Sequence, residues 1–460
     1  MAAPERYPAL VRRLLALLTL AACGDPSGPD PEAAAVLAVN GAALPLIAPG
    51  AALAIEGRGF GVTPGTVQLG SAALEATSWT NETVLATAPT DPTGILSVTT
   101  ADGLALTRSV RAAPIDTTRT DARTWMAGAD LPLGLAQASA AGIAFPDGDG
   151  YSSLIVLFGG QRADGSLSDS TWLGRVENGA VTEWAAAPDT VIPAARRLHA
   201  MVGASSLTSR LANDGVAWMI GGLDQTGRAI SDVRGIAIGS TGSYGFWTPL
   251  AAMPVNRAGM AAAVGLGAIY VVGGFGNDSL AAREVLIATI NTEGTINGWF
   301  RGPDLPEGRA FASTAVVGDR LYVLGGVAGA VHPDTTDLGT LRATVYSITL
   351  SRRTGFVVGT DWQVEPPLAH ARARHAVFAS GRGLIVVGGV TDDPTAPETE
   401  WAPLTNGALG TFAERVAATV PRGPLRDFAA PVVRDAQGRI VVTTLAGRDS
   451  TGVSAQAWWH

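Results

Sequence analysis

Five arginines stand at the starts of predicted strands that recur along the C-terminal part of the chain: Arg196, Arg257, Arg309, Arg372 and Arg426. A guanidinium grips a carboxylate or sulfate through two parallel hydrogen bonds, so a ring of these groups at one mouth of a repeat structure would bind anions. The same arginines could instead be structural and pair with backbone or with carboxylates between neighbouring sheets. The sequence favours the structural interpretation and leaves the binding hypothesis open.

Other candidate chemical groups are sparse. His199 and His375 follow two of these arginines and are predicted to be packed residues, and the remaining histidines lack metal-ligand spacing. The repeat shows no nucleophile beside a base and no suitably spaced carboxylate pair, so we predict neither a metal nor a cofactor. Acidic residues that follow glycine doublets are typical of turns rather than of calcium sites: Asp224, Asp278, Asp392, Asp393 and Asp449.

A repeated unit must position these residues. Apolar strands end at glycine doublets that begin at Gly159, Gly221, Gly273, Gly325 and Gly388, at intervals of 52 to 63 residues, and a sixth, degenerate copy ends at Gly447. Tryptophans keep the same period: Trp125, Trp184, Trp247, Trp299 and Trp362, with Phe412 at the next position. A period near 50 residues built from short strands predicts a propeller of four-stranded antiparallel blades.

Each residue type has an expected task in such a blade. The glycines let the chain turn where a side chain would collide with the neighbouring blade. The tryptophans fill the wider space between blades far from the axis.

The unit resembles the kelch repeat, on the stretches Arg196-x-x-His199-Ala200 and Arg372-x-x-His375-Ala376, the glycine doublets and the closing tryptophans. The resemblance covers residues 117–460 and implies a kelch-type β-propeller with six four-stranded blades. The first unit has Leu135 where arginine is expected, and the last unit lacks a glycine doublet. We predict that residues 120–125 form the fourth strand of the last blade, which closes the ring and removes exposed edges.

Residues 35–113 have a different texture, with short strands separated by glycine, proline and aspartate turns, which predicts a β-sandwich. Residues 49–70 resemble the IPT/TIG immunoglobulin-like domain, whose G-x-G-F loop is here Gly57-Arg58-Gly59-Phe60. The resemblance implies a spacer or protein-contact module. We expect the glycines to permit positive φ in a turn rather than to bind phosphate.

The N-terminus carries a basic start, a short apolar run and the only cysteine, Cys23. The ending "LAAC" resembles the lipobox of bacterial lipoproteins, which implies a signal peptide at residues 1–22, lipidation of Cys23 and a flexible tether at residues 23–34. The alternative is an ordinary signal peptide. The lipoprotein interpretation places the protein in a bacterial cell envelope, and Gly24 in place of aspartate favours the outer over the inner membrane.

The formal net charge of -8, with no basic stripe, argues against a nucleic-acid partner. Three function classes remain. The favoured one is a non-catalytic, membrane-tethered scaffold that recognises a protein or glycan through variable propeller loops. The others are a sugar-active enzyme resembling the kelch-type sialic-acid mutarotase-epimerase, and a purely structural envelope protein. The copper radical oxidases among kelch propellers are nearly excluded. Their cofactor requires a cysteine linked to a tyrosine, and the only cysteine here, Cys23, belongs to the predicted lipidation signal.

Overall fold

The structure of this protein is a computed structural model. It describes residues 34–40, 42, 46–47, 50–112, 125–147, 150–187, 194–206, 211, 215–335, 338–380, 383–405, 407–414, 426–436, 440–449 and 452–459. Every regular element in these ranges is a β-strand, and none of them contains a helix that could span a membrane. Cys23, the predicted signal peptide and most of the predicted tether lie outside the described residues.

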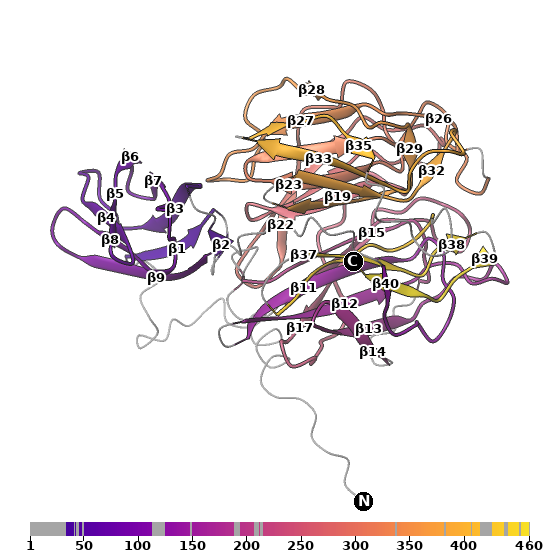
Figure 1. The fold of residues 1–460 in the computed structure, drawn as a ribbon, viewed down its shortest axis with the longest axis horizontal. Coiled ribbons are helices and arrows are strands. Elements are labelled where there is room, and N and C mark those ends of the chain that lie inside the picture. The colour runs from indigo at the N-terminus through magenta and orange to yellow at the C-terminus, as the bar shows by residue number, and fades with distance from the viewer. Residues whose placement is uncertain are drawn as a thin grey trace, which may run out of the picture.

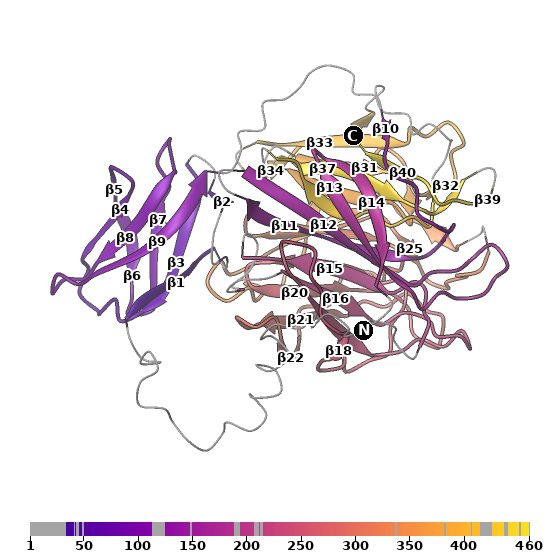
Figure 2. The same cartoon turned by 90° about the horizontal axis from the view of Figure 1, so that it is seen from below.

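The first nine strands form two sheets that lie to one side of the remaining strands in both views (Figures 1 and 2). One sheet has the order β1 (Ala35–Val39), β3 (Ala52–Arg58), β7 (Thr83–Thr87), β6 (Ala76–Trp79). The other has the order β2 (Leu46–Ile47), β9 (Ala105–Ala112), β8 (Gly94–Thr99), β4 (Thr66–Leu69), β5 (Ala72–Leu74). Apolar side chains from both sheets form a core of their own.

The loop Gly57 to Phe60 packs on that core. Phe60 is fully buried, and its ring lies 6.3 Å from that of Trp79. Gly59 has a φ of 75°, as predicted, whereas Gly57 is required for space, because a Cβ there would collide with the Phe60 ring. The loop therefore has a packing role in the structure.

The rest of the described chain forms six further antiparallel sheets, most of them four-stranded, and short hairpins, which is consistent with a kelch-type repeat fold. The first of these sheets has the order β11 (Ser139–Asp147), β12 (Gly150–Phe158), β13 (Thr171–Glu177), β14 (Ala180–Ala186), and the second has the order β15 (Ala200–Ala204), β16 (Gly215–Ile220), β17 (Val233–Ile238), β18 (Thr248–Pro249). The third has the order β19 (Ala261–Gly265), β20 (Ala268–Val272), β21 (Val285–Ile290), β22 (Ile296–Arg301). The fourth has the order β23 (Ser313–Val317), β24 (Arg320–Leu324), β27 (Val345–Thr349), β28 (Gln363–Glu365).

Two further sheets follow. One contains β30 (Ala376–Ser380), β31 (Gly383–Val387) and β33 (Thr399–Thr405), with β34 (Ala408–Leu409) and β35 (Ala413–Glu414) both paired to β33. The other has the order β36 (Val432–Arg434), β37 (Ile440–Leu445), β40 (Ala457–Trp459), β10 (Met126–Ala127). Short hairpins extend from the sheets: β25 (Val327–Ala328) with β26 (Thr340–Leu341), β29 (Arg372–Ala373) with β32 (Val390–Thr391), and β38 (Arg448–Asp449) with β39 (Gly452–Val453).

The last sheet joins the two ends of the repeat region. Met126 of β10 pairs with Trp459, and Ala127 pairs with Trp458. The preceding Trp125 is buried in a cluster that also contains Phe378. This strand begins one residue after the segment predicted to complete the last blade, of which residues 120–124 lie outside the described residues. In this sheet, strand β10, which precedes the repeats in the sequence, therefore pairs with β40, the last strand of the chain.

The six sheets after β9 surround a single channel of about 420 Å³. The first strand of each sheet lines this channel and is its innermost strand: β11, β15, β19, β23, β30 and β36. The lining is mostly alanine, glycine and valine. The sheets are therefore arranged around one central axis.

Glycine doublets mark the places where neighbouring sheets touch. In one example, the N–H of Gly274 donates to the carbonyl of Arg309 on the next sheet at 2.7 Å. Both Gly273 and Gly274 have positive φ, and a Cβ on Gly273 would lie 2.0 Å from that same carbonyl oxygen. The predicted reason for the doublets is confirmed, because a side chain here would displace the adjacent sheet. The equivalent bonds join Gly160 to Arg196, Gly222 to Arg257 and Gly326 to Arg372.

The tryptophans tie the outer strands together. Three indole N–H groups donate to a carbonyl that lies four residues after the tryptophan of the preceding sheet. These bonds run from Trp184 to Ala129 at 2.8 Å, from Trp299 to Ala251 at 2.8 Å and from Trp362 to Pro303 at 3.2 Å. Two residues beyond each acceptor, an apolar side chain is buried: Leu131, Met253 and Leu305. The tryptophans thus combine wedge packing with a polar link between sheets.

Candidate functional site

One residue just before each innermost strand has left-handed backbone geometry, with φ between 53° and 59°: Gln137, Leu198, Gly259, Phe311, Arg374 and Asp427. The N–H groups of Leu198, Gly259, Phe311 and Arg374 each donate to the carbonyl of the equivalent residue on the preceding sheet, at 2.7 to 3.0 Å. The N–H of Gln137 donates to the carbonyl of Asp427 at 2.8 Å. These six residues, the axial ring, surround one end of the central channel.

The axial ring divides that mouth into two halves. Leu198, Gly259 and Phe311 give an apolar half, in which the Phe311 ring packs against Phe275 with centroids 5.5 Å apart. Val331 and Leu338, from the connection between β25 and β26, are buried against this half. The connection is therefore anchored over the mouth by apolar packing.

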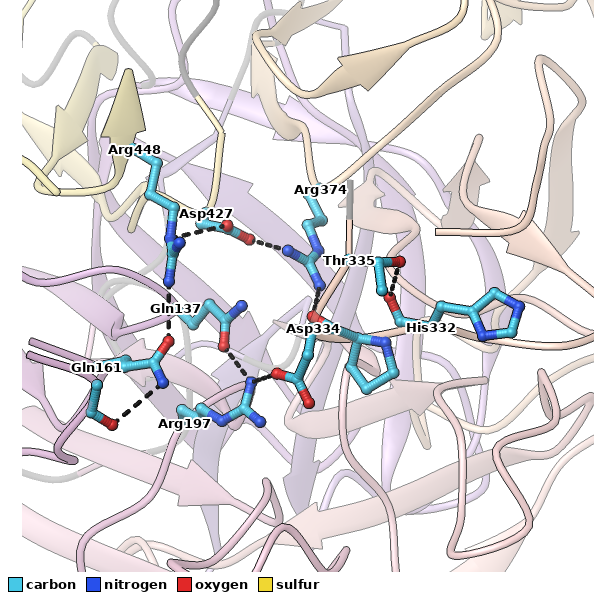
Figure 3. A network of polar contacts seen from close by, with 11 residues as sticks. Gln137, Gln161, Arg197, His332, Asp334, Thr335, Arg374, Asp427 and Arg448 are labelled. Atoms are coloured by element: carbon cyan, nitrogen blue, oxygen red, sulfur yellow. Dashed lines mark hydrogen bonds and ion pairs between the residues drawn. The ribbon is translucent and has the colours of Figure 1, made fainter. Parts of the chain in front are cut away.

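The other half of the mouth is a polar cavity of about 310 Å³. Arg374 lies in it with its guanidinium 4.4 Å above the Phe311 ring centroid. One terminal nitrogen of Arg374 donates to Asp427, and the other donates to the carbonyl of Pro333 at 2.6 Å (Figure 3). Burial lowers the pKa of Arg374 from its ordinary value, although the ion pair with Asp427 offsets part of that effect. Arg374 is thus held in one orientation by three contacts.

Two further arginines come from other sheets: Arg448 lines the cavity, and Arg197 lies beside it and contacts two of the lining residues. Arg197 donates to the side-chain oxygen of Gln137 at 2.7 Å and forms an ion pair with Asp334 at 2.7 Å. Arg448 donates to the side-chain oxygen of Gln161 at 2.8 Å, and its Nε lies 3.6 Å from the Asp427 carboxylate. Figure 3 shows these side chains converging from different parts of the chain.

The cavity has an excess of positive charge. Three arginines, Arg374, Arg426 and Arg448, line it together with two carboxylates, Asp334 and Asp427, and Asp334 is also paired with Arg197 beside the cavity. Arg426 is half-buried in the cavity wall, and its guanidinium has no hydrogen bond or ion pair within the described ranges. The buried Nε of Arg374 lacks a hydrogen-bond partner, and the buried Nε of Arg448 has only the 3.6 Å ion pair with Asp427. Unused guanidinium donors of this kind suit an anionic ligand.

Four of the five arginines singled out in the sequence lie elsewhere, between the strands of their sheets. Arg196, Arg309 and Arg372 are 1%, 1% and 2% exposed. Each of the four pairs with a carboxylate, which is Asp232 for Arg196, Glu284 for Arg257, Glu307 for Arg309 and Glu400 for Arg372. Arg342, followed by Arg309, lowers the pKa of Glu307 to about 2. These guanidiniums are committed to structural partners.

Arg426 differs because it occupies another register. Its backbone pairs in both directions with Arg448, as the backbone of Arg197 pairs with Leu223. Arg426 is therefore equivalent to Arg197 rather than to Arg196, which corrects the alignment inferred from sequence. The degenerate last unit, with Ala446 before Gly447, concealed this shift of one residue.

The histidines that follow the consensus arginines are packed residues. His199 and His375 are almost fully buried, and burial, reinforced by the adjacent Arg196 or Arg372, lowers the pKa of each to about 3. Asp224, Asp278 and Asp393 accept backbone N–H bonds from residues two positions further on, as turn formers do. Within the described part of the chain, no group of histidine and acidic side chains could hold a metal ion.

Sequence reasoning missed Arg197, Arg374 and Arg448. A signal for Arg374 was present, because it stands two residues after a consensus arginine at the position that becomes the axial ring. Arg448 directly follows Gly447. What the sequence could not show is that these positions from separate repeats meet at one mouth.

No family model matches this chain. It is similar to alpha-scruin of Limulus polyphemus, at 29% identity over 194 residues, which cover 42% of this chain and 20% of that protein. It is also similar to beta-scruin of the same organism, at 31% identity over 152 residues, which cover 32% of this chain and 14% of that protein. The chain thus spans a fifth or less of the length of either relative. Scruins are kelch-repeat proteins, which supports a kelch-type repeat fold.

Proposed function

We propose that this protein is a non-catalytic binding scaffold that recognises a partner, protein or glycan, at the mouth formed by the axial ring. In this proposal the sheets around the channel are the six blades of a kelch-type propeller. The first two sheets form an IPT/TIG immunoglobulin-like domain that acts as a spacer, and lipidated Cys23 tethers the whole to the envelope, in the outer membrane.

The observation that carries the proposal is the unbalanced charge of the mouth cavity. Three arginines line the cavity with two carboxylates, one of which is already paired with Arg197, and the Arg426 guanidinium has no intramolecular partner among the described residues. Both carboxylates are paired with arginines. Such a site can hold an anion on a rigid frame.

Binding and catalysis are separated by one experiment. The purified protein, immobilised, is expected to retain a protein or glycan partner from an envelope fraction, and to retain less of it when Arg426 is replaced by glutamine. A panel of sugars that includes sialic acids should be recovered chemically unchanged. Turnover of any panel member, abolished by Arg426→Gln or Asp427→Asn, would contradict the proposal and favour a sugar-active enzyme.

The anchor is tested separately. Cys23→Ser should prevent incorporation of labelled fatty acid in a bacterial host, because a hydroxyl does not replace the thiol in thioether formation. Lipoprotein termini carry two or three acyl chains, which is enough for stable attachment. Labelling of the Cys23→Ser protein would refute the lipoprotein proposal without affecting the binding site, and recovery of the wild type with the inner membrane would contradict the proposed location.

A further inference from the structure

The mouth cavity already contains a carboxylate from the same chain. Asp334 belongs to the connection between β25 and β26, and it crosses to an arginine of another sheet, Arg197, at 2.7 Å (Figure 3). The Asp334 side chain is nevertheless 66% exposed. Arg197 is 9% exposed, so the open side of this ion pair is the carboxylate, and an external carboxylate could take the place of Asp334.

The same tip also supplies a main-chain acceptor. The carbonyl of Pro333, next to Asp334, accepts a hydrogen bond from Arg374 at 2.6 Å. A single stretch of polypeptide therefore satisfies two arginines at once, one through a carboxylate and one through a backbone carbonyl. This combination is what an acidic residue within a peptide presents to a receptor.

Donors remain for a second acidic group. The Arg426 guanidinium has no hydrogen bond or ion pair among the described residues, and the buried Nε of Arg374 has no hydrogen-bond partner. Buried donors without acceptors are costly, so a ligand that satisfies them binds favourably. The geometry favours a polypeptide over a sugar, because the occupant already in place offers backbone as well as carboxylate.

We propose that this mouth binds an aspartate or glutamate side chain of a partner polypeptide, received by Arg426 and Arg448, and that Asp334 is an internal competitor for the site. This inference rests on the proposed function and names the partner class for it. The partner's acidic side chain enters the cavity, Arg197 exchanges Asp334 for a carboxylate or backbone carbonyl of the partner, and the apolar anchor at Val331 and Leu338 stays in place.

The test uses the full chain in mild detergent and a fluorescein-labelled, C-amidated peptide Gly-Asp-Gly-Glu-Gly, with the Asn/Gln version as its neutral counterpart. Fluorescence anisotropy should show binding of the acidic peptide alone. Arg426→Gln should weaken that binding by about tenfold or more, because an interfacial charge pair is lost. Asp334→Asn should strengthen it by roughly threefold or more, because a competing carboxylate is removed.

Matched variants control for net charge. Arg175→Gln, on an exposed position of β13, and Asp361→Asn, at an exposed position beside Trp362, make the same charge changes far from the cavity lining. These two control variants should have the same affinity for the acidic peptide as the wild type. All variants should have the same melting temperature as the wild type. Equal binding of the neutral peptide, or an Asp334→Asn affinity no higher than that of the wild type, would overturn the inference.

Two outcomes separate this inference from the proposed function. If a partner is retained from the envelope fraction but the acidic peptide does not bind, the acidic-peptide inference is wrong and the scaffold function stands. Methyl glucuronide is the glycan probe. If methyl glucuronide displaces the retained partner from the wild type, if this effect is lost in Arg426→Gln, and if the peptide does not bind, the ligand is a sugar acid and the inference is again overturned.

Discussion

Arg372 and Arg374 are two residues apart in the sequence, yet they have opposite surroundings. Arg372 lies inside its sheet, 2% exposed, and pairs with the completely buried Glu400 and the carbonyl of Gly388. Arg374 points into the mouth cavity and contacts a neighbouring strand connection. The left-handed backbone at Arg374, with a φ of 56°, turns the chain between them. One backbone torsion thus separates an arginine that holds the sheet from an arginine that can face a ligand.

The comparison suggests that the position of an arginine within the repeat decides whether it stabilises the fold or is available to bind a ligand. The four arginines within the sheets, Arg196, Arg257, Arg309 and Arg372, each pair with a carboxylate of the same repeat. The partner of Arg372, Glu400, is completely buried and would be stranded by substitution.

At the mouth, Arg374 and Arg448 share the buried Asp427, and Arg197 pairs with the exposed Asp334. The guanidinium of Arg426 has no partner among the described residues, so its loss leaves little unsatisfied. We therefore expect substitution of Arg372 to lower the free energy of unfolding much more than substitution of Arg426.

The largest effect is expected for Arg372→Gln. This change leaves the Glu400 carboxylate buried without its charged partner, which costs about 3–5 kcal/mol in the free energy of unfolding. Urea denaturation of both proteins measures the difference. The double variant Arg372→Met, Glu400→Leu should recover part of the loss, and a single variant as stable as the wild type would break the distinction between the arginines within the sheets and those at the mouth.

The contact between sheets is tested next by Gly273→Ala. Its Cβ would meet the Arg309 carbonyl at 2.0 Å while the backbone holds a φ of 62°, so we expect a loss of roughly 3 kcal/mol. Gly318→Ala is the matched control, since Gly318 has a φ of 59° and open space around it. That variant should cost about 1 kcal/mol, from backbone strain alone. Similar losses in chemical denaturation would show that the close approach of the sheets is unimportant.

The pH dependence of stability probes the two histidines that follow Arg196 and Arg372. His199 and His375 have pKa values of about 3 in the folded protein, against 6.5 ordinarily. The unfolded chain takes up protons below pH 6.5 and the folded protein does not until about pH 3, so stability falls as the pH falls through this window. Each histidine should contribute on the order of 1 kcal/mol per pH unit.

Met260 occupies the equivalent position on another sheet, so His199→Met with His375→Met is a conservative test. Urea midpoints at pH 7.5 and 5.0 should differ less for this double variant than for the wild type. Glu307 does not confuse the comparison, because its pKa of about 2 places its effect below pH 4.5. An unchanged pH dependence would mean that the histidines are hydrated in the folded state.

The smallest effect is expected for Arg426→Gln. With no intramolecular partner among the described residues, its removal should change the free energy of unfolding by less than about 0.5 kcal/mol. Thermal and urea denaturation measure this change. A large destabilisation would place Arg426 with the structural arginines and remove the basis for a ligand site.

Much of the fold could be predicted because its signals are local. Gly273–Gly274 ends an apolar strand where only glycine avoids the next sheet, and the period of such doublets revealed the repeat before any contact was known. The role of the tryptophans was predicted only in part. Their packing followed from their size, but the hydrogen bond from Trp299 to Ala251 depends on how two sheets are placed relative to each other.

The sequence by itself determined that arginines recur with the repeat, because in four copies an arginine before the innermost strand pairs with a carboxylate of the same repeat. It could not determine which arginines meet, because Arg197, Arg374 and Arg448 belong to separate repeats and are brought together only around the axis (Figure 3). Nor could it show that Asp334 reaches across the mouth, since no local pattern encodes a contact over 137 residues. Only the tertiary structure decided that, because closing the sheets around an axis makes distant positions neighbours.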